Sequence, residues 1–179
     1  MARHIKFNKS KMTLILNCTK KLLDRIKPSS TVPDGMSSTL LGSWYATALF
    51  WKPQVALLVN EKTLLPVLMP LAPATNLATR FPKHLAVVLC AHGLPRQFID
   101  HELAQMSEVQ YAKTSNRSVV SIMNQFSYQA EVYREYLETK DLLALSLKLA
   151  ETPCSPLYKS AISPDRELLA LVKTTGFVV

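Results

Sequence analysis

The most extended pattern of apolar and polar positions runs from residue 108 to residue 138. Val109, Tyr111 and Lys113 alternate with Gln110 and Ala112, the period of two that is typical of a half-exposed strand. After a polar turn, apolar residues recur at steps of three and four, which predicts a helix over 117–138 with one buried face. Ser115 or Asn116 is expected to cap this helix.

Other apolar runs predict the rest of the fold. Strands are expected at 12–18, 54–60, 63–69 and 108–113. Pro66 favours an edge position or a bulge for the third strand because proline cannot donate to a sheet ladder. Besides 117–138, helices are expected after Thr19, on both sides of a break at 93–95, and at 141–151 and 163–173, the last with Ser163 as cap. The fold class is therefore α+β: residues 12–179 form a single domain with a mainly antiparallel sheet of about four strands, packed by several helices.

A short aromatic run, WYATALF at residues 44–50, follows helical spacing. Its inward residues are expected to be Trp44 and Leu49. We interpret the aromatic residues of this run as core rather than as a platform on which nucleic-acid bases stack.

The predicted helix at 117–138 also carries a polar line. Arg117, Ser121, Asn124 and Tyr128 stand at i, i+4, i+7 and i+11, and Lys113 precedes them. The simpler interpretation is a solvated helix face. The alternative is a ligand-binding surface, in which the unpaired N–H groups of the first helical turn would help to bind an anion.

The positive charge is concentrated at the start of the chain. Residues 1–27 hold eight Lys or Arg and one acid, Asp24, whereas the remainder holds thirteen basic and twelve acidic residues, so that +7 of the net charge of +8 lies in this segment. Residues 1–11 are expected to be a flexible basic arm, followed by a strand and a basic helix. The candidates for nucleic-acid binding are Arg3, Lys6, Lys9, Lys11, Lys20, Lys21 and Arg25.

Several classes of site are not indicated. The sequence lacks GxxxxGK[ST], GxGxxG, GxSxG, HExxH and paired CxxC motifs, and its acidic residues are dispersed. His84, His92, His101 and Cys90 do not have the spacing of a known zinc site, so we predict no metal and no cofactor. Cys18 and Cys90 are expected to be buried, which leaves Cys154, in a loop, as the thiol to test for reactivity.

The expected location is the cytoplasm, without membrane association. No apolar run is long enough to span a bilayer, and the apolar run after Met12 has no small-residue cleavage site of the kind a signal peptide needs. Three scattered cysteines fit a reducing compartment.

Five segments of the chain resemble an uncharacterised bacterial domain family of unknown function. Within them, the string KTxxRSVxxxMN is the most specific, and it is matched by Lys113, Thr114, Arg117, Ser118, Val119, Met123 and Asn124, with Gln125 where an acidic residue usually follows. The segments are CTKKLLDRIK (18–27), GSWYATALF with VNEKTLLPVLMP (42–70), KTSNRSVVSIMNQF (113–126), LSLKLAETPCSPL (145–157) and SPDRELLAL (163–171). The resemblance implies no established activity.

Three hypotheses about function follow. The first is a binding or regulatory module that engages nucleic acid or a protein partner through the basic arm, the first helix and the polar face of residues 113–128. The second is an enzyme or toxin-like effector acting on a phosphate-containing substrate through Lys113, Arg117 and Asn124. The third is a structural domain that binds a partner through an exposed apolar patch. The sequence does not decide the oligomeric state.

Overall fold

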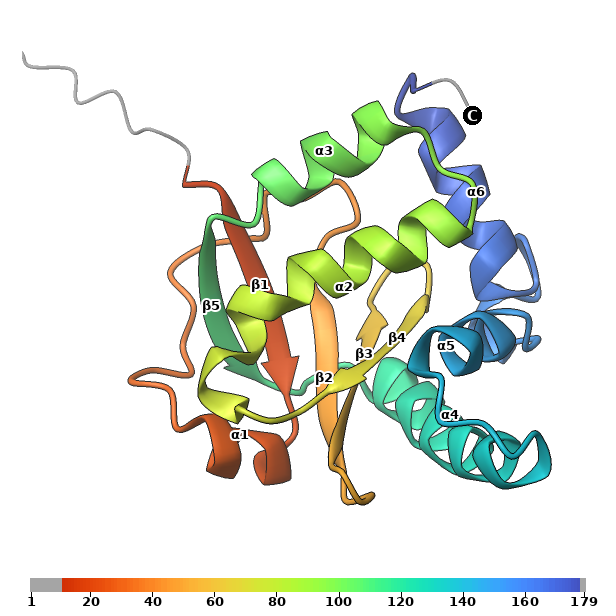
Figure 1. Ribbon diagram of the computed structural model, residues 1–179. Helices are drawn as coiled ribbons and strands as arrows, with labels where there is room; N and C mark the ends of the chain where they lie inside the picture. The colour runs from red at the N-terminus through yellow and green to blue at the C-terminus, as the bar shows by residue number, and fades with distance from the viewer. Residues whose placement is uncertain (1–10, 178–179) are drawn as a thin grey trace, which may run out of the picture.

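A five-stranded mixed sheet forms the centre of the protein. The computed structural model describes residues 11–177, and Figure 1 shows the sheet with helices on both of its faces. The strands are β1 (Thr13–Cys18), β2 (Trp44–Leu49), β3 (Val55–Asn60), β4 (Pro66–Pro70) and β5 (Glu108–Lys113), and they lie in the order β4-β3-β2-β1-β5. β1 is parallel to both of its neighbours, β2 and β5, whereas β3 is antiparallel to both of its neighbours, β2 and β4.

The predicted α+β class is confirmed, but the expectation of a mainly antiparallel sheet of about four strands is wrong. The additional strand is β2, which the aromatic spacing of residues 44–50 had concealed. All six of its residues are buried. A strand buried on both faces shows no alternation of apolar and polar residues, so its sequence pattern is ambiguous between strand and helix.

Two hydrophobic cores lie on opposite faces of the sheet. One face packs against α1 (Lys20–Ile26), α2 (Leu77–Ala91) and α3 (Arg96–Ala104), together with residues of α6 (Pro164–Thr174). The other face packs against α4 (Arg117–Tyr136) and residues of α5 (Leu142–Ala150). Short 3-10 turns at Ala74–Asn76 and Ser155–Leu157 complete the secondary structure between residues 11 and 177.

Of the two alternatives for the strand that contains Pro66, an edge position or a bulge, the edge position is confirmed. This strand, β4, is covered on its outer side by α5, and the backbone N–H of Leu68 donates to the Ser146 hydroxyl at 2.9 Å. Ser146 also donates to the Leu142 carbonyl within its own helix. A helix hydroxyl thus satisfies a strand donor that has no neighbouring strand.

Helices α1, α4 and α6 begin where the sequence predicts, but the expected side-chain cap forms only at α4. Asn116 is the N-cap of α4, and its side chain accepts hydrogen bonds from the N–H groups of Ser118 and Val119. Thr19 and Ser163 precede α1 and α6 as expected, yet neither side chain caps its helix. The Thr19 hydroxyl instead pairs with the hydroxyl of Thr47 on β2, at 3.0 Å. Within residues 11–177, no helix is both long and apolar enough to cross a bilayer.

Candidate binding surface at the ends of the parallel strands

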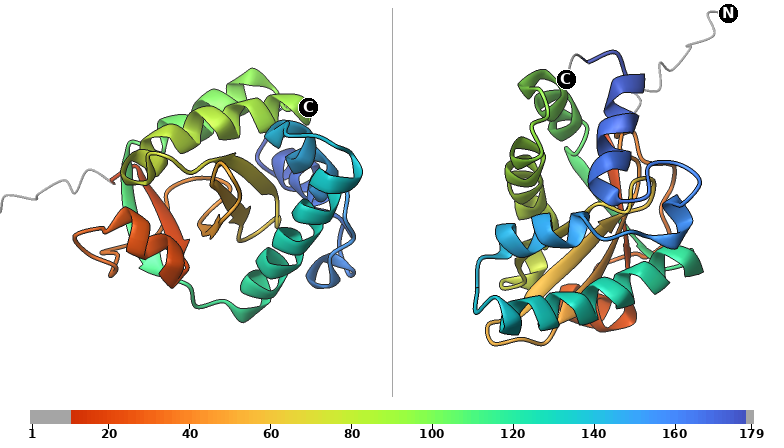
Figure 2. Two further views of the ribbon diagram at one scale, coloured as in Figure 1. Left: turned by 60° about the horizontal axis from the view of Figure 1, so that its bottom comes forward. Right: turned by 90° about the vertical axis from the view of Figure 1, so that its right-hand side faces the viewer.

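Three segments that are distant in sequence meet at one end of the sheet because β1, β2 and β5 are parallel. Cys18 lies opposite Lys113 in the register of β1 and β5, and opposite Ala46 in the register of β1 and β2. The residues that follow the three strands therefore emerge together: α1 after β1, Phe50 after β2, and the turn of residues 114–116 after β5. Figure 2, left, looks toward this end of the sheet, with α1 and α4 flanking it.

The two helices that start at this end pack on opposite faces of the sheet. Leu22 and Ile26 of α1 belong to one core, whereas Val119 and Phe126 of α4 belong to the other. In open sheets with parallel strands, ligands bind at such a position, where the connections after two adjacent strands leave to opposite faces. The topology therefore makes this end of the sheet the first place to look for a site.

A buried tyrosine holds the turn between β5 and α4. The hydroxyl of Tyr45 accepts a hydrogen bond from the backbone N–H of Asn116 at 3.1 Å and pairs with the Ser115 hydroxyl at 3.3 Å. Tyr45 itself is 1% exposed. The start of α4 is therefore fixed by a residue of a central strand.

Three of the five predicted ligand-binding residues line one shallow surface pocket. Arg117, Ser121 and Asn124 border a hollow of about 420 Å³, together with Thr114, Ser115 and Val120. Lys113 is exposed and lies outside this set, and Tyr128 lies farther along α4. The predicted polar line exists as an exposed helix face, and its first three residues, but not Tyr128, border a single pocket.

The first turn of α4 offers fewer free donors than the sequence implied. Two of its N–H groups, those of Ser118 and Val119, already donate to the side chain of Asn116, and the N–H of Val120 donates to the Asn116 carbonyl. An anion at this helix start would compete with the cap for the same groups. The pocket therefore depends on the side chain of Arg117 for any attraction to a negative charge.

The exposed ring of Phe50 is a feature that sequence reasoning missed. Phe50 is 55% exposed, directly after β2. Two cations of α1 approach its ring: the Lys21 ammonium lies 5.5 Å and the Arg25 guanidinium 5.4 Å from the ring centre. The sequence does contain an indication of this exposed ring, because Phe50 ends the apolar run and Lys52 and Gln54 follow shortly after it. Interpreting the whole run as core left Phe50 out of the candidate site.

A groove beside Phe50 connects α1 with α4. It has a volume of about 340 Å³ and is bordered by Lys21 of α1, by Phe50 and Trp51, and by Tyr128 and Glu131 of α4. Tyr128 is 71% exposed. The groove thus combines two aromatic rings that are open to solvent, those of Phe50 and Tyr128, with one basic residue of α1 and one acidic residue of α4.

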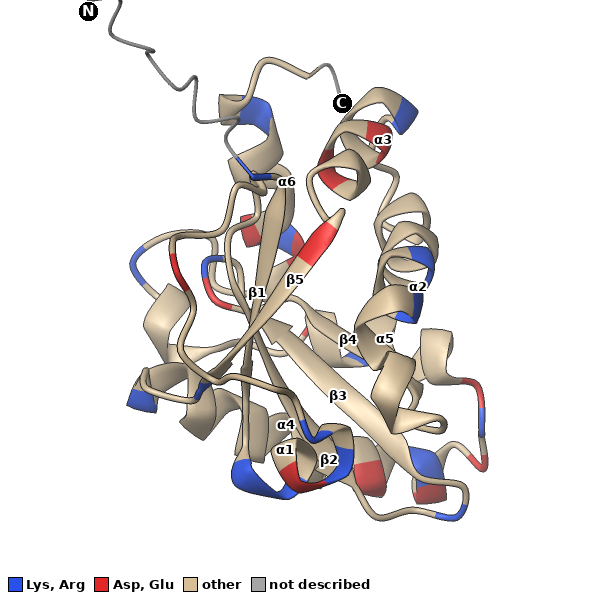
Figure 3. Ribbon diagram, turned by 90° about the vertical axis from the view of Figure 1, so that its left-hand side faces the viewer, with Lys and Arg blue, Asp and Glu red and all other residues tan. Residues whose placement is uncertain are grey.

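The predicted basic residues are divided between two ends of β1. Lys20, Lys21 and Arg25 belong to α1, which follows the strand, and Figure 3 shows the basic positions of this helix at the end of the sheet. Lys11 precedes the strand, and six residues of strand separate the two groups by about 20 Å. Arg3, Lys6 and Lys9 lie outside the described residues.

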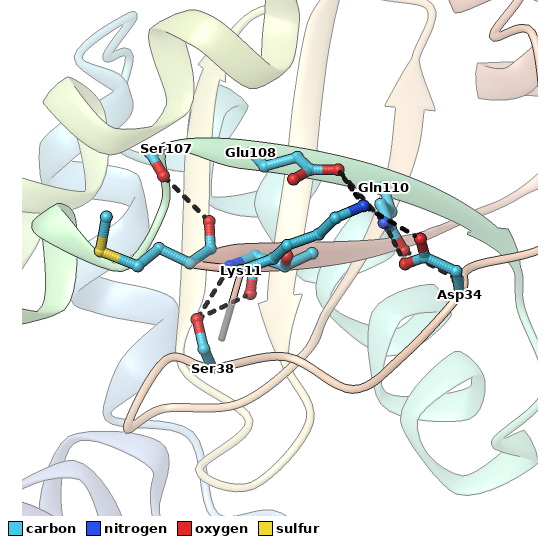
Figure 4. A network of polar contacts seen from close by, with 8 residues as sticks. Lys11, Asp34, Ser38, Ser107, Glu108 and Gln110 are labelled. Atoms are coloured by element: carbon cyan, nitrogen blue, oxygen red, sulfur yellow. Dashed lines mark hydrogen bonds and ion pairs between the residues drawn. The ribbon is translucent and has the colours of Figure 1, made fainter. Parts of the chain in front are cut away.

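Lys11 is engaged in ion pairs at its own end of the sheet. Its ammonium lies 3.2 Å from Asp34 and 3.8 Å from Glu108, and Asp34 also bonds to Gln110 (Figure 4). These contacts raise the pKa of Lys11, chiefly through the hydrogen bond to Asp34, and lower the pKa of Asp34, chiefly through Gln110. The positive charge of Lys11 is therefore partly balanced where it stands.

The turn of residues 60–62 lies at the opposite end of the sheet from Arg117. Asn60 ends β3 and faces Trp44, the first residue of β2. Its amide donates to the Leu41 carbonyl at 2.8 Å, and its carbonyl oxygen accepts from Lys62, Thr63 and the Thr63 hydroxyl. Asn60 is fully buried and structural, and this turn does not share a cleft with the pocket on α4.

The cysteines correct two expectations. Cys90 is exposed rather than buried, and Cys154 is buried although it lies in a loop. Burial raises the pKa of Cys154 to about 11 and that of Cys18 to about 12. His84 and His92 lie on or directly after α2, His101 lies on α3, and no cluster of three or more metal-ligating side chains occurs between residues 11 and 177.

Comparison with known protein families matches most of the chain to one domain family. A family model described as "Domain of unknown function (DUF6933)" matches residues 15–167. No curated protein and no solved structure matches the chain.

Proposed function

Since the chain belongs to the DUF6933 family, whose description names no activity, function has to be inferred from the surface of this chain, and we propose that it is a binding module for single-stranded nucleic acid. The observation that carries the proposal is the Phe50 ring, exposed at the end of the parallel strands and flanked by Lys21 and Arg25. Proteins that bind single strands combine aromatic side chains, on which bases stack, with cations that follow the phosphates.

The surroundings of Phe50 support a strand-shaped ligand. Tyr128 provides a second exposed ring along the same groove. Arg117, on the same helix about three turns earlier, borders a second pocket with the hydroxyl of Ser121 and the amide of Asn124. A strand that stacks on Phe50 would have cations from α1 on one side and polar groups of α4 on the other.

The exposed ring of Phe50 favours a single strand over a duplex. In a duplex the base faces are stacked on one another and cannot meet a protein ring without distortion. A single strand offers these faces freely. The cytoplasmic location expected from the sequence would place the protein with RNA and with transiently exposed single-stranded DNA.

The proposal is tested by fluorescence anisotropy with labelled oligo-dT and oligo-U of about 15 nucleotides and a duplex of equal length. We expect single strands to bind more tightly than the duplex, with an affinity that falls as salt rises from about 50 to 200 mM. Phe50→Ala should weaken binding by about 5- to 150-fold, the equivalent of about 1–3 kcal/mol for one stacked base. Phe50→Trp should retain binding because it keeps a ring.

Two matched controls lie outside the groove. Tyr136→Ala removes another exposed ring of α4, and Lys173→Ala removes an exposed cation of α6. Both should bind as wild type does. An absence of binding at low salt, or equal affinities for wild type and Phe50→Ala, would refute the proposal.

A further inference from the structure

A second, more enclosed cavity lies on the other side of the turn that joins β2 to β3. It has a volume of about 450 Å³ and lies between this turn, the end of β4 and the connection from α4 to α5. Its apolar wall consists of Trp51, Val55, Pro70, Leu142 and Leu145. Trp51 borders both this cavity and the groove beside Phe50.

The wall of this cavity belongs to the folded core. Val55 is 4% exposed and Leu145 is fully buried, and both pack in the core between the sheet and α4. The inner wall of the cavity is therefore held in place by the packing of the core. Its volume lies within the range of roughly 300–1,000 Å³ that is usual for small-molecule sites, and such sites have mostly apolar walls with a few polar groups.

The charged groups at its mouth are mixed, with an excess of cations. Lys52, Arg134 and Lys140 border the cavity, as do Glu135 and Glu138. The guanidinium carbon of Arg134 lies 4.4 Å from the centre of a Trp51 ring. Between residues 11 and 177, the salt bridges within 4.0 Å include none made by Arg134.

These features define the class of ligand. An apolar wall with an aromatic ring suits a ring system or short alkyl body, and an arginine that stands at the mouth without a carboxylate partner suits a planar acidic group. We infer that this cavity binds a small amphipathic organic anion, with its apolar body against Trp51 and Leu145 and its acidic group at Arg134. Trp51 is shared with the groove beside Phe50, whereas Arg134, Leu142 and Leu145 border this cavity and not that groove.

Two probes of similar shape separate the apolar and the anionic parts of the inference. The full chain is titrated with 1-anilinonaphthalene-8-sulfonate and with neutral N-phenyl-1-naphthylamine, each followed by its own fluorescence and by quenching of tryptophan. Both should bind saturably at one site. Arg134→Ala should weaken the sulfonate about tenfold, as expected for loss of a charge-assisted hydrogen bond, and leave the neutral amine unchanged.

A cavity-filling variant locates the binding. Leu142 is half-buried at the start of α5, and Leu142→Trp should occupy the cavity and abolish binding of both probes. Arg166→Ala, which removes an exposed cation of α6, is the matched control and should bind both probes as wild type does. Near-ultraviolet circular dichroism of each variant establishes that the core remains packed.

Three results would overturn the inference. Binding of neither probe by wild type would show that the cavity takes no such ligand. Unchanged binding in Leu142→Trp, with native circular dichroism, would place the probe elsewhere. An equal loss of both probes in Arg134→Ala would show that this side chain contributes packing and does not recognise an anion.

Discussion

The hydroxyl oxygen of Tyr45 accepts a hydrogen bond from the backbone N–H of Asn116, with 3.1 Å between oxygen and nitrogen, although 71 positions separate the two residues. Tyr45 lies on β2, two strands away from β5. Through this bond a central strand of the sheet sets the position at which α4 begins. The orientation of Arg117, the first residue of α4, depends on that position.

Tyr45→Phe should therefore destabilise the start of α4 while preserving the core. The ring remains, but the Asn116 N–H loses its partner in a partly buried position, which should cost about 1–2 kcal/mol in the free energy of unfolding. Urea denaturation measures this change. Amide hydrogen exchange should also speed up at residues 115–117. Tyr136→Phe, at an exposed tyrosine, is the control and should change neither quantity. Equal stability of Tyr45→Phe and wild type would contradict this role.

A second prediction concerns Glu102, which is fully buried on α3. Its two carboxylate oxygens accept the backbone N–H groups of Leu40 and Leu41 at 2.8 and 3.0 Å. Burial raises its pKa above the ordinary value of 4.5, and the two backbone bonds oppose this shift. Glu102→Ala should destabilise the protein by about 1–3 kcal/mol because both backbone N–H groups lose their acceptor.

The sign of the pH dependence follows from the raised pKa. The folded state holds the Glu102 proton more tightly than the unfolded chain, so the stabilisation is complete below about pH 4.5 and declines as pH rises through the folded-state pKa. Glu102→Ala lacks this titration. The difference in unfolding free energy between wild type and variant should therefore be largest in acid and should shrink as pH rises. Urea denaturation at a series of pH values measures it, and a difference that grows with pH would contradict the prediction.

Thiol labelling provides a third prediction. Cys90 is exposed, whereas burial raises the pKa of Cys154 to about 11 and of Cys18 to about 12. With 5,5′-dithiobis(2-nitrobenzoic acid) at pH 8, one thiol should react rapidly and two only on unfolding, because the thiolate is the reactive form. Cys90→Ser should remove the fast phase. A fast phase that persists in this variant would show that Cys154 or Cys18 is accessible.

Local patterns in the sequence were sufficient where an element has one buried and one exposed face. The apolar stripe of α4 from Val119 to Ala130 was predicted, and its cap was narrowed to Ser115 or Asn116, because each depends only on spacing along the chain. Pro66 at an edge strand follows from a missing N–H, which is also a local property. These elements keep their character whatever their partners.

Burial on both faces removed the same signal from β2. Trp44 to Leu49 are all buried, so alternation could not identify them as a strand. The loop position of Cys154 suggested a thiol to test for reactivity, but this residue is buried. A loop residue can lie beneath neighbouring elements of the fold. Cys154 packs in the core shared by α4 and α5, which no neighbouring residue in the sequence indicates.

By itself the sequence determined the fold class, the polar face of α4 from Arg117 to Tyr128 and the concentration of positive charge near the start of the chain. Only the tertiary structure decided how these features combine. The parallel pairing of β1 with β2 and β5 brings α1, Phe50 and the start of α4 to one end of the sheet, and β1 separates Lys11 from Lys21. Strand order and direction arise from pairings between distant segments, and periodicity within a segment carries no information about its partner.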